Sequence, residues 1–483
     1  MSLFSEKLSE MIHAANIKVA SLSSLSGVER SFIQKMMSGE RIPNDPEVLE
    51  KLADTLMLAP AQRRILLQAY RISKMGEAVY YRRVMVKRLL ESIRDYMNPG
   101  PVRPLPPART ALDRPALPLT GKGAVTEAFC LLADAAAAEG EAQLLVIFQP
   151  GCWLTGHLQR YCSGYAGLTV EHIVCFDSEV QYQKENRYNL QCFQQLFPLL
   201  LGAARYQPYF YYEKASMLES PASVLPCLAL AGDRVLTFSA DGSGGLLLEG
   251  EDYVRLYRKI FEQAKAECSP LLDSGAVDLK RKYRDLFFSR NTQIDTSYSL
   301  TYEPCLGLFC SMDMIRRQAA ADLPHREEIL SMFQQRIQSI SLLKNTRRNF
   351  SFFTETGLRD FLETGRVSEL PEEMYSPLPR AFRAELLRRM LECAEEGRFS
   401  PFFIRENKFP IPKDFGMAVE DLSSIRINLR HPYRGLMVLH LQEKSLAFSF
   451  RDFMEYLQDT ALLESREKTV AKLREIQGEF LGT

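Results

Sequence analysis

The sequence lacks the cysteine patterns that usually mark metal or disulfide sites. Its ten cysteines are scattered, with no CxxC pair and no Cys/His cluster at zinc spacing. Cys305 and Cys310 are close together, but one such pair is weak evidence for a metal. Buried thiols in a reducing compartment explain the cysteines better. The sequence therefore predicts neither a metal nor any other cofactor.

Signatures of catalysis are also missing. The glycine-rich segment ADGSGG at 240–245 has neither the GxGxxG spacing nor the lysine of a phosphate-binding loop, and its serine is not in a GxSxG motif. The histidines are isolated, without HExxH spacing. We interpret ADGSGG as a hairpin turn, and we predict no catalytic residue and no enzymatic activity.

Long apolar runs and a net charge are absent as well. The run around 197–204 is too short to span a bilayer, and the N-terminus begins directly with an amphipathic helix. We therefore expect a cytoplasmic protein with no membrane partner. Lys+Arg and Asp+Glu both number 60, so any nucleic-acid-binding role requires positive charge that is concentrated locally, as it is over residues 62–94.

Residues 18–43, KVASLSSLSGVERSFIQKMMSGERIP, contain two short apolar-periodic segments. Ala20, Leu22 and Leu25 form the stripe of the first segment. The stripe of the second consists of Val28, Phe32, Ile33 and Met36. Gly27 stands between them, where the chain must turn sharply with a positive φ. This pattern predicts a helix-turn-helix, whose second helix can enter the DNA major groove.

These residues, with LSEMIHAAN before them and a helix ending in LADTLML after them, resemble the Cro/C1-type (XRE) DNA-binding domain over about residues 3–70. The resemblance implies that bases are read from the start of the second helix, which includes Val28, and from one turn further on. Many members hold a phosphate with a glutamine where this chain has Val19, so that contact must come from Lys18 or Arg41 or be missing. The DNA-binding residues predicted in this way are Lys18, Glu29, Arg30, Ser31, Gln34, Lys35 and Arg41.

The chemistry of these side chains agrees with that role. Arg30 and Lys35 can donate to guanine or phosphate, Gln34 can pair with adenine, and Ser31 can serve either. Glu29 can accept from cytosine but would repel phosphate. The alternatives are solvated surface charges or a small helical domain that binds protein.

Residues 77–97 are predicted to form one long helix in which Val79, Val86 and Ile93 recur every seven residues. This seam would pair two subunits of a homodimer, or it would pack onto the following domain. The proline-rich residues 98–118 are a semi-rigid linker and the clearest domain boundary.

Beyond the linker, strands alternate with helices, which predicts an α/β region with a largely parallel sheet. The fold class is therefore multidomain: an all-α N-terminal helix-turn-helix domain followed by an α/β or α+β C-terminal region. The predicted boundaries are 1–75 for the DNA-binding domain, 76–97 for the connecting helix, 98–118 for the linker, 119–270 for an α/β sensor domain, and 271–483 for a second α/β or α+β domain with a C-terminal helix.

The last two predicted domains share a weak sequence similarity. LLLEGEDYVRLY at 246–257 and LAFSFRDFMEYL at 446–457 have apolar residues at matching offsets, with strands predicted at 246–249 and 446–450. Two related lobes from a duplication explain the similarity, and so does the generic pattern of a hairpin that precedes a helix.

A candidate ligand pocket in the sensor domain is suggested by aromatic and polar residues at or after strand ends. Its predicted members are Trp153, Asp177, Arg187, Tyr209 and Tyr211. For each of them, ordinary packing between sheet and helices is the alternative, and Asp177 also has the position of a helix cap.

Together these features predict a sequence-specific transcriptional regulator with double-stranded operator DNA as its partner. Its C-terminal region would sense a small-molecule, peptide or protein effector. Two alternatives remain from the sequence: an enzyme that carries a DNA-binding head, and a peptide- or protein-interaction regulator. The second lacks the expected 34-residue helical period.

Overall fold

The computed structural model describes residues 2–97, 114–138, 143–181, 187–214, 224–272, 296–343, 348–368, 370, 372–419, 424–431 and 435–482. The chain divides into two compact units. The first comprises Met1–Met85 with the short segment Lys184–Arg187, and the second comprises Val86–Gln183 and Tyr188–Thr483. Each unit is described by itself.

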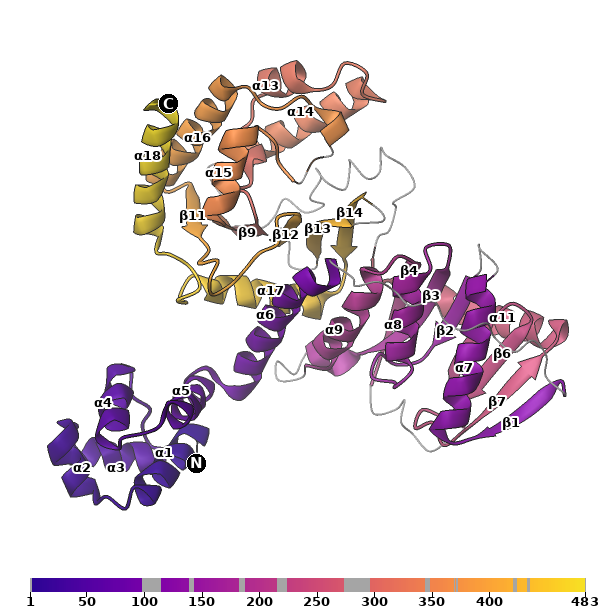
Figure 1. Cartoon of the computed structure of the whole chain (residues 1–483), viewed down its shortest axis with the longest axis horizontal. Helices are drawn as coiled ribbons and strands as arrows, with labels where there is room; N and C mark the ends of the chain where they lie inside the picture. Colours follow the sequence, from indigo (N-terminus) through magenta and orange to yellow (C-terminus); the bar gives the residue numbers. More distant parts are fainter. Residues whose placement is uncertain are drawn as a thin grey trace. The chain divides into compact units, whose positions relative to one another are not determined.

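The first unit contains a bundle of five short helices (Figure 1). They are α1 (Leu3–Ala14), α2 (Val19–Ser26), α3 (Arg30–Ser38), α4 (Glu47–Thr55) and α5 (Pro60–Met75). Phe4 of α1 lies edge-on against Tyr70 of α5, with ring centroids 5.8 Å apart. The Tyr70 hydroxyl donates to the Pro43 carbonyl at 3.0 Å. These contacts close α5 over the other helices and make one apolar core.

The turn between α2 and α3 is formed as predicted. Gly27 ends α2 with φ of 70°, a left-handed conformation. The predicted stripe of α2 is only partly correct: Leu22 is fully buried, but Leu25 is 71% exposed and Ala20 is also exposed. An eight-residue helix has barely two turns, so one residue can point straight into this small core while the others lie at its edge.

Helix α6 (Glu77–Met97) confirms the predicted long helix. Val86, Leu89, Leu90 and Ile93 are buried within the single chain, and in the second unit the Lys87 ammonium lies 5.9 Å from the Phe409 ring centroid. The apolar seam therefore packs within its own chain, which is the second of the two alternatives. Of the predicted linker, residues 98–113 lie outside the described residues, and residues 116–118 already belong to strand β1.

The first sheet has eight strands in the order β1-β7-β6-β5-β2-β3-β4-β8. They are β1 (Ala116–Thr120), β2 (Gln143–Ile147), β3 (Thr169–Asp177), β4 (Arg205–Glu213), β5 (Cys227–Ala231), β6 (Arg234–Phe238), β7 (Gly244–Glu249) and β8 (Ser269–Pro270). Only β2–β3 and β3–β4 are parallel pairs. The prediction of a largely parallel sheet is therefore wrong, because the short connections after β5 and β6 can only form antiparallel hairpins.

Helices cover both faces of the first sheet. α7 (Gly121–Ala138), α8 (Thr155–Gly164) and α9 (Tyr188–Leu200) follow β1, β2 and β3, with the short 3-10 turn η1 (Ser178–Gln181) before α9. α11 (Glu251–Ala266) covers the other face, where Phe261 is buried among Leu145, Ile173 and Leu230. The first sheet with these helices is called the first-sheet region below.

The second sheet has six strands in the order β11-β10-β9-β12-β13-β14. They are β9 (Thr296–Thr301), β10 (Arg348–Phe353), β11 (Phe399–Phe403), β12 (Phe415–Val419), β13 (Ile425–His431) and β14 (Gly435–Leu441). In this order the first two neighbouring pairs are parallel and the other three are antiparallel. Strands β4-β3-β2-β5-β6-β7 of the first sheet show the same sequence of parallel and antiparallel pairs. The two sheets thus share one six-strand topology.

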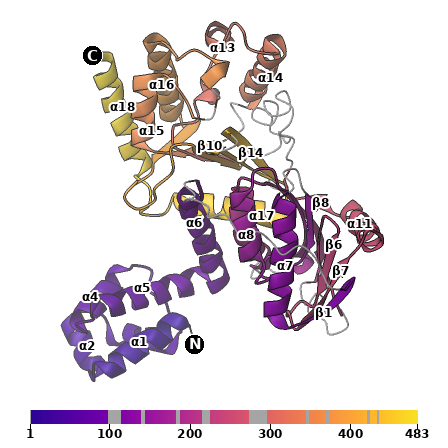
Figure 2. The ribbon, with the colours of Figure 1, turned by 45° about the vertical axis from the view of Figure 1, so that its right-hand side comes forward.

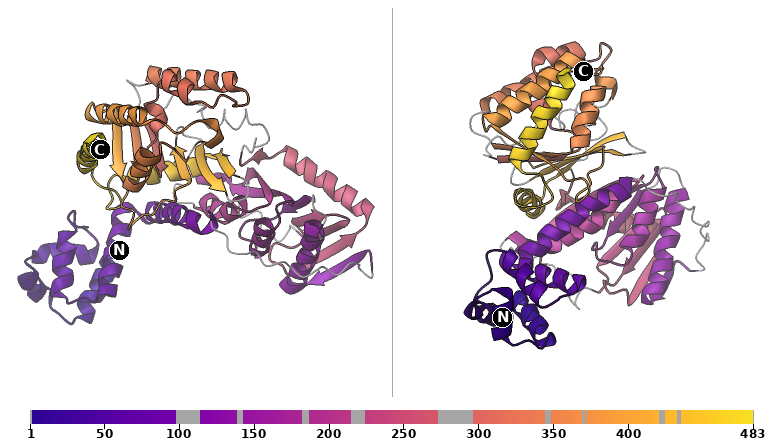
Figure 3. Two further views of the ribbon diagram at one scale, coloured as in Figure 1. Left: turned by 45° about the horizontal axis from the view of Figure 1, so that its top comes forward. Right: turned by 60° about the vertical axis from the view of Figure 1, so that its left-hand side comes forward.

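Most helices of the second-sheet region lie on one face of its sheet (Figure 2). They are α13 (Met312–Gln318), α14 (Arg326–Leu343), α15 (Glu355–Thr364), α16 (Arg380–Glu395) and α18 (Arg466–Gly482), with the 3-10 turns η2 (Leu306–Leu308) and η3 (Glu372–Met374) between strands and helices. The C-terminal helix α18 packs beside α16 and β11 (Figure 3). Its Leu473 and Ile476 join Phe353 and Phe399 in one core.

α17 (Lys444–Leu457) corrects the predicted strand at 446–450, which is helical throughout. Its buried residues recur at the three- and four-residue spacing of a helix face: Leu446, Ala447, Phe450, Phe453, Met454 and Leu457. The Glu443 carboxylate accepts from the backbone amides of Ser445 and Leu446 and caps the first turn. In the shared topology, α17 follows β14 as α11 follows β7. The similarity between 246–257 and 446–457 instead aligns strand β7 with the start of helix α17, so it does not align equivalent elements.

Candidate nucleic-acid interface

Helix α3 has one buried and one exposed face. Ile33 and Met36 are fully buried in the core of the first unit. Five side chains are exposed, those of Arg30, Ser31, Gln34, Lys35 and Ser38. Their spacing places them on adjoining turns of a single helix face, because residues three and four apart are neighbours on a helix. The fold therefore presents together the residues that the sequence predicted for base reading.

The start of α3 carries a hydrogen-bonded pair of side chains. Glu29 is the N-cap residue, and its carboxylate accepts from the Ser31 hydroxyl rather than from a backbone amide of the helix. A negative charge at this helix end repels phosphate but can accept from the amino group of cytosine. A base contact at Glu29 therefore stays a prediction.

Val28 does not take part in this surface. It is 8% exposed and belongs to the apolar core of the first unit. The expectation that it contributes to base reading is therefore wrong. Its side chain follows the Gly27 turn directly and is needed to close α3 onto the core.

Two exposed cations adjoin the helices of this motif in sequence. Lys18 precedes α2, whose first turn has no side-chain cap, and Arg41 follows the Gly39 turn, where its backbone amide donates to the Lys35 carbonyl at 3.1 Å. Both side chains are exposed. An uncapped helix start beside a lysine can bind phosphate, which is the contact left open by Val19.

The positive charge of residues 62–94 is partly neutralised within the fold. Arg63 forms an ion pair with Asp54 at 2.6 Å and donates to the Leu58 carbonyl at 3.0 Å. The Lys74 ammonium donates to the Asn44 carbonyl at 2.8 Å. These two side chains therefore stabilise the helix bundle, and the cations around α3 are the better candidates for phosphate contacts.

The predicted ligand-pocket residues have separate surroundings. The Trp153 indole donates to the Thr126 hydroxyl at 2.9 Å and lies under the Lys122 ammonium. It also covers the turn at Gly242, where a β-carbon would be 2.4 Å from the indole ring. Gly242 has φ of 75° in the β6–β7 hairpin, so ADGSGG is a turn, as predicted.

Asp177 is a cap. At the end of β3 its carboxylate accepts from the Glu179 amide at 2.9 Å, at the start of η1. Arg187 lies over the Tyr81 ring, 5.0 Å from its centroid. Tyr209 and Tyr211 both face α11, with the Lys265 ammonium 5.5 Å from the Tyr209 ring. Each of these residues has a capping or packing contact of its own, and the ligand pocket stays a prediction.

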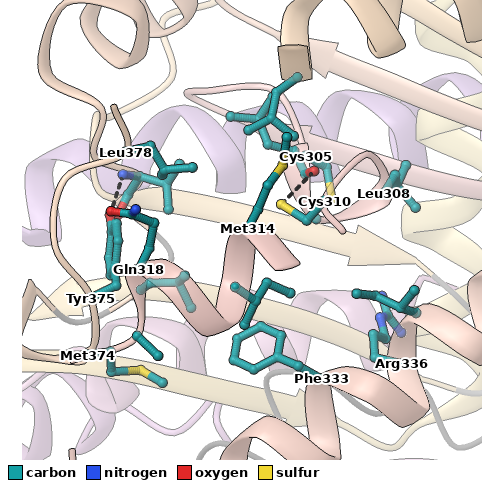
Figure 4. A pocket seen from close by; sticks show the side chains of 18 of the residues that line it. Cys305, Leu308, Cys310, Met314, Gln318, Phe333, Arg336, Met374, Tyr375 and Leu378 are labelled. Carbon is teal, nitrogen blue, oxygen red and sulfur yellow. Dashed lines mark hydrogen bonds between the residues drawn. The ribbon is translucent and has the colours of Figure 1, made fainter. Parts of the chain in front are cut away.

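A cavity does occur in the second-sheet region (Figure 4). Of the residues singled out from the sequence, only Cys305 and Cys310 line it. Sequence reasoning missed the site because its walls come from three stretches that are far apart in the chain, within 303–337, 361–386 and 426–428. Strand β13 alternates apolar and polar residues (IRINLRH), so Asn428 does not differ from its polar neighbours in the sequence.

Metal-binding clusters and membrane-spanning helices are both absent from the part of the chain that the structure describes. No cluster of three or more His, Cys, Asp or Glu side chains in those ranges could hold a metal ion. Among the described helices, none combines the length and the apolar run that a membrane crossing needs.

Comparison with known proteins identifies the N-terminal region. A family model described as the Cro/C1-type HTH DNA-binding domain matches residues 7–62, which confirms the predicted helix-turn-helix. A search of curated proteins finds no match to the chain.

Two solved structures are similar at low level. One is TrmBL2, an archaeal chromatin protein, at 11% identity and a TM-score of 0.19, covering 52% of this chain and 87% of that one. The other is phosphatidylserine synthase of Haemophilus influenzae Rd KW20, at 12% identity and a TM-score of 0.23, covering 82% and 97%. At such TM-scores neither similarity supports an argument about fold or function.

Proposed function

We propose that this protein is a sequence-specific transcriptional regulator that reads operator DNA through α3. The observation that carries the proposal is the exposed face of α3, where Arg30, Gln34 and Lys35 stand over buried Ile33 and Met36. Arginine and lysine can donate to guanine, and glutamine pairs with adenine. The Cro/C1-type match over residues 7–62 supports DNA as the partner.

The large second unit is proposed to be a sensing region rather than an enzyme. Its two sheets share one six-strand topology, which supports two related lobes derived from a duplication. A ligand, peptide or protein bound there would shift the population of DNA-binding conformations. The expected location of such a regulator is the cytoplasm.

A homodimer is part of the proposal, because paired half-sites give helix-turn-helix proteins their operator specificity. The surface that pairs the subunits must lie outside Val86, Leu89 and Ile93, since these side chains are buried within one chain. Light scattering of the full chain, with and without DNA, measures the subunit number directly.

The decisive experiment is selection of preferred DNA from a random library, followed by fluorescence-anisotropy binding of the selected site and a scrambled one. Wild type is compared with the Arg30→Ala, Lys35→Ala double variant. The Lys7→Ala, Lys51→Ala double variant removes the same charge from α1 and α4 and is the matched control.

The expected result is that wild type and control bind the selected site at least about a hundredfold more tightly than the scrambled one, and that the α3 variant loses this preference. Equal, steeply salt-dependent binding of all three proteins to both sites would mean phosphate contacts alone and would overturn the proposal.

A further inference from the structure

The second-sheet region contains a cavity of about 170 Å³. Its walls are formed by the segment 303–310, by α13 and α14, by the segment 367–378 and by β13. Figure 4 shows Met314 of α13 and Phe333 of α14 facing the same space. An apolar cavity of roughly 150 Å³ can hold benzene. This one therefore has room for a ligand with one ring or two small fused rings.

One buried acceptor oxygen in the cavity wall has no donor among the described residues. Asn428 on β13 lines the cavity and is only 5% exposed. Its side-chain oxygen, Oδ1, has no hydrogen-bond donor among the described residues. Because alternate strand residues face opposite sides, Ile427 and Leu429 point to the other face of the sheet. A buried carbonyl oxygen without a donor is costly, so the site is built to receive a donor from a ligand.

Two other polar side chains at the wall, those of Glu303 and Tyr375, are hydrogen-bonded within the protein. The Glu303 carboxylate accepts from the Ser368 amide at 3.1 Å and from its hydroxyl at 2.6 Å. The Tyr375 hydroxyl accepts from the Val367 amide at 2.8 Å. These bonds hold the segment 367–378 in place as one wall. Asn428 is left as the anchoring group for a ligand.

Charged and thiol side chains also line the cavity. They include Arg336, Arg426 and Glu303. The Cys310 thiol donates to the Leu306 carbonyl at 3.5 Å, and burial raises its pKa to about 11. It is therefore an uncharged, apolar part of the lining at neutral pH.

We propose that this cavity binds a small, uncharged ring compound whose N–H or O–H group donates to Asn428 Oδ1. The ligand is mostly apolar because Met314, Phe333 and their neighbours enclose it. Such a ligand would be the effector of the proposed sensing region. Only the expected effect of the ligand on DNA affinity rests on the proposed function.

The test uses indole and benzofuran as probes, because they have the same shape and differ in the N–H donor. Binding to the full chain is measured by isothermal titration calorimetry. Asn428→Leu removes the acceptor at similar volume. Asn407→Leu, at an exposed position of the same region, is the matched control. Ala319→Leu fills part of the cavity and leaves Asn428 in place.

Wild type and the Asn407 variant should bind one indole per chain at least about tenfold more tightly than benzofuran. Asn428→Leu should abolish this preference, and Ala319→Leu should weaken both probes. Far-UV circular dichroism checks that each variant is folded. Equal affinity of wild type for the two probes, or no saturable binding, would overturn the proposal. So would a folded Ala319→Leu variant that binds both probes as wild type does.

The effect of ligand binding on DNA affinity is measured separately, by fluorescence anisotropy with and without saturating indole. A change in DNA affinity that Asn428→Leu removes supports both the site and the sensing role. Indole binding without any change supports the cavity site and overturns its role in regulation. Loss of the DNA preference in the α3 experiment would overturn the proposed function, while the calorimetry still decides on the cavity.

Discussion

The hydroxyl of Tyr212 donates to the Glu443 carboxylate at 2.5 Å, across 231 residues of sequence. Tyr212 lies near the end of β4 in the first-sheet region, and Glu443 caps α17 in the second. The same carboxylate accepts from the Ser445 hydroxyl at 2.6 Å and from the Leu446 amide at 2.7 Å. One buried side chain thus fixes a helix start and joins it to the other sheet region.

Tyr212→Phe should lower the free energy of unfolding by about 1–2 kcal/mol, because it removes a hydrogen bond to a charged, buried acceptor. Tyr253→Phe is a suitable control, since Tyr253 is 37% exposed against 38% for Tyr212. Urea unfolding followed by circular dichroism gives both values. Equal stabilities of the two variants would show that the bond contributes nothing.

The stability of the first-sheet region should fall in acid because of His172. This side chain is fully buried between the Tyr206 hydroxyl, 2.7 Å from Nδ1, and the Phe148 carbonyl, 2.8 Å from Nε2. The carbonyl can only accept, so Nε2 carries the proton and Nδ1 accepts from Tyr206. Burial lowers the pKa of His172 from 6.5 to about 4.

Between these two pKa values the unfolded chain binds a proton that the folded chain does not, so stability falls as pH decreases from 6.5 and the loss is complete near pH 4. The full effect is about 3 kcal/mol. Fluorescence of Trp153, the only tryptophan, follows urea unfolding of this region at pH 7, 6 and 5. His172→Gln should show a flatter pH dependence, and an unchanged slope would contradict the assignment.

Gly27→Ala should destabilise the helix-turn-helix by about 1 kcal/mol through the backbone alone, because φ is 70° and no atom lies within 4 Å of the added β-carbon. Gly357→Ala should cost more, since its β-carbon would be 2.1 Å from the Tyr302 carbonyl oxygen. Thermal unfolding by circular dichroism compares them. A Gly27→Ala variant as stable as wild type would mean that the turn relaxes.

Salt titrations of DNA binding should distinguish residues that contact bases from residues that contact phosphates. Gln34→Ala should relax sequence preference and leave the salt dependence unchanged, because an uncharged side chain releases no counterion. Lys18→Ala and Arg41→Ala should each weaken binding to all sequences and reduce the slope of log K against log salt by about 0.9. Anisotropy between 50 and about 200 mM salt measures both. Identical slopes in Gln34→Ala and Lys18→Ala would contradict these roles.

The sequence alone determined the N-terminal domain, because its information is local. Gly27 and Gly39 adopt the left-handed turns that they predict, and the buried face of α3 follows from the spacing of Ile33 and Met36. Helix α6 and strand β7 were equally predictable, since periodicity and turn residues act within a few positions.

Only the tertiary structure decided the features that depend on distant segments. The direction of strand pairing follows from which strands meet, and the seam of α6 proved to be covered by its own chain. Helix α17 depends on a cap at Glu443, whose carboxylate is also bound by Tyr212. The cavity at Asn428 is enclosed by three stretches that are far apart in the chain, within 303–337, 361–386 and 426–428. No local sequence pattern predicts such an enclosure.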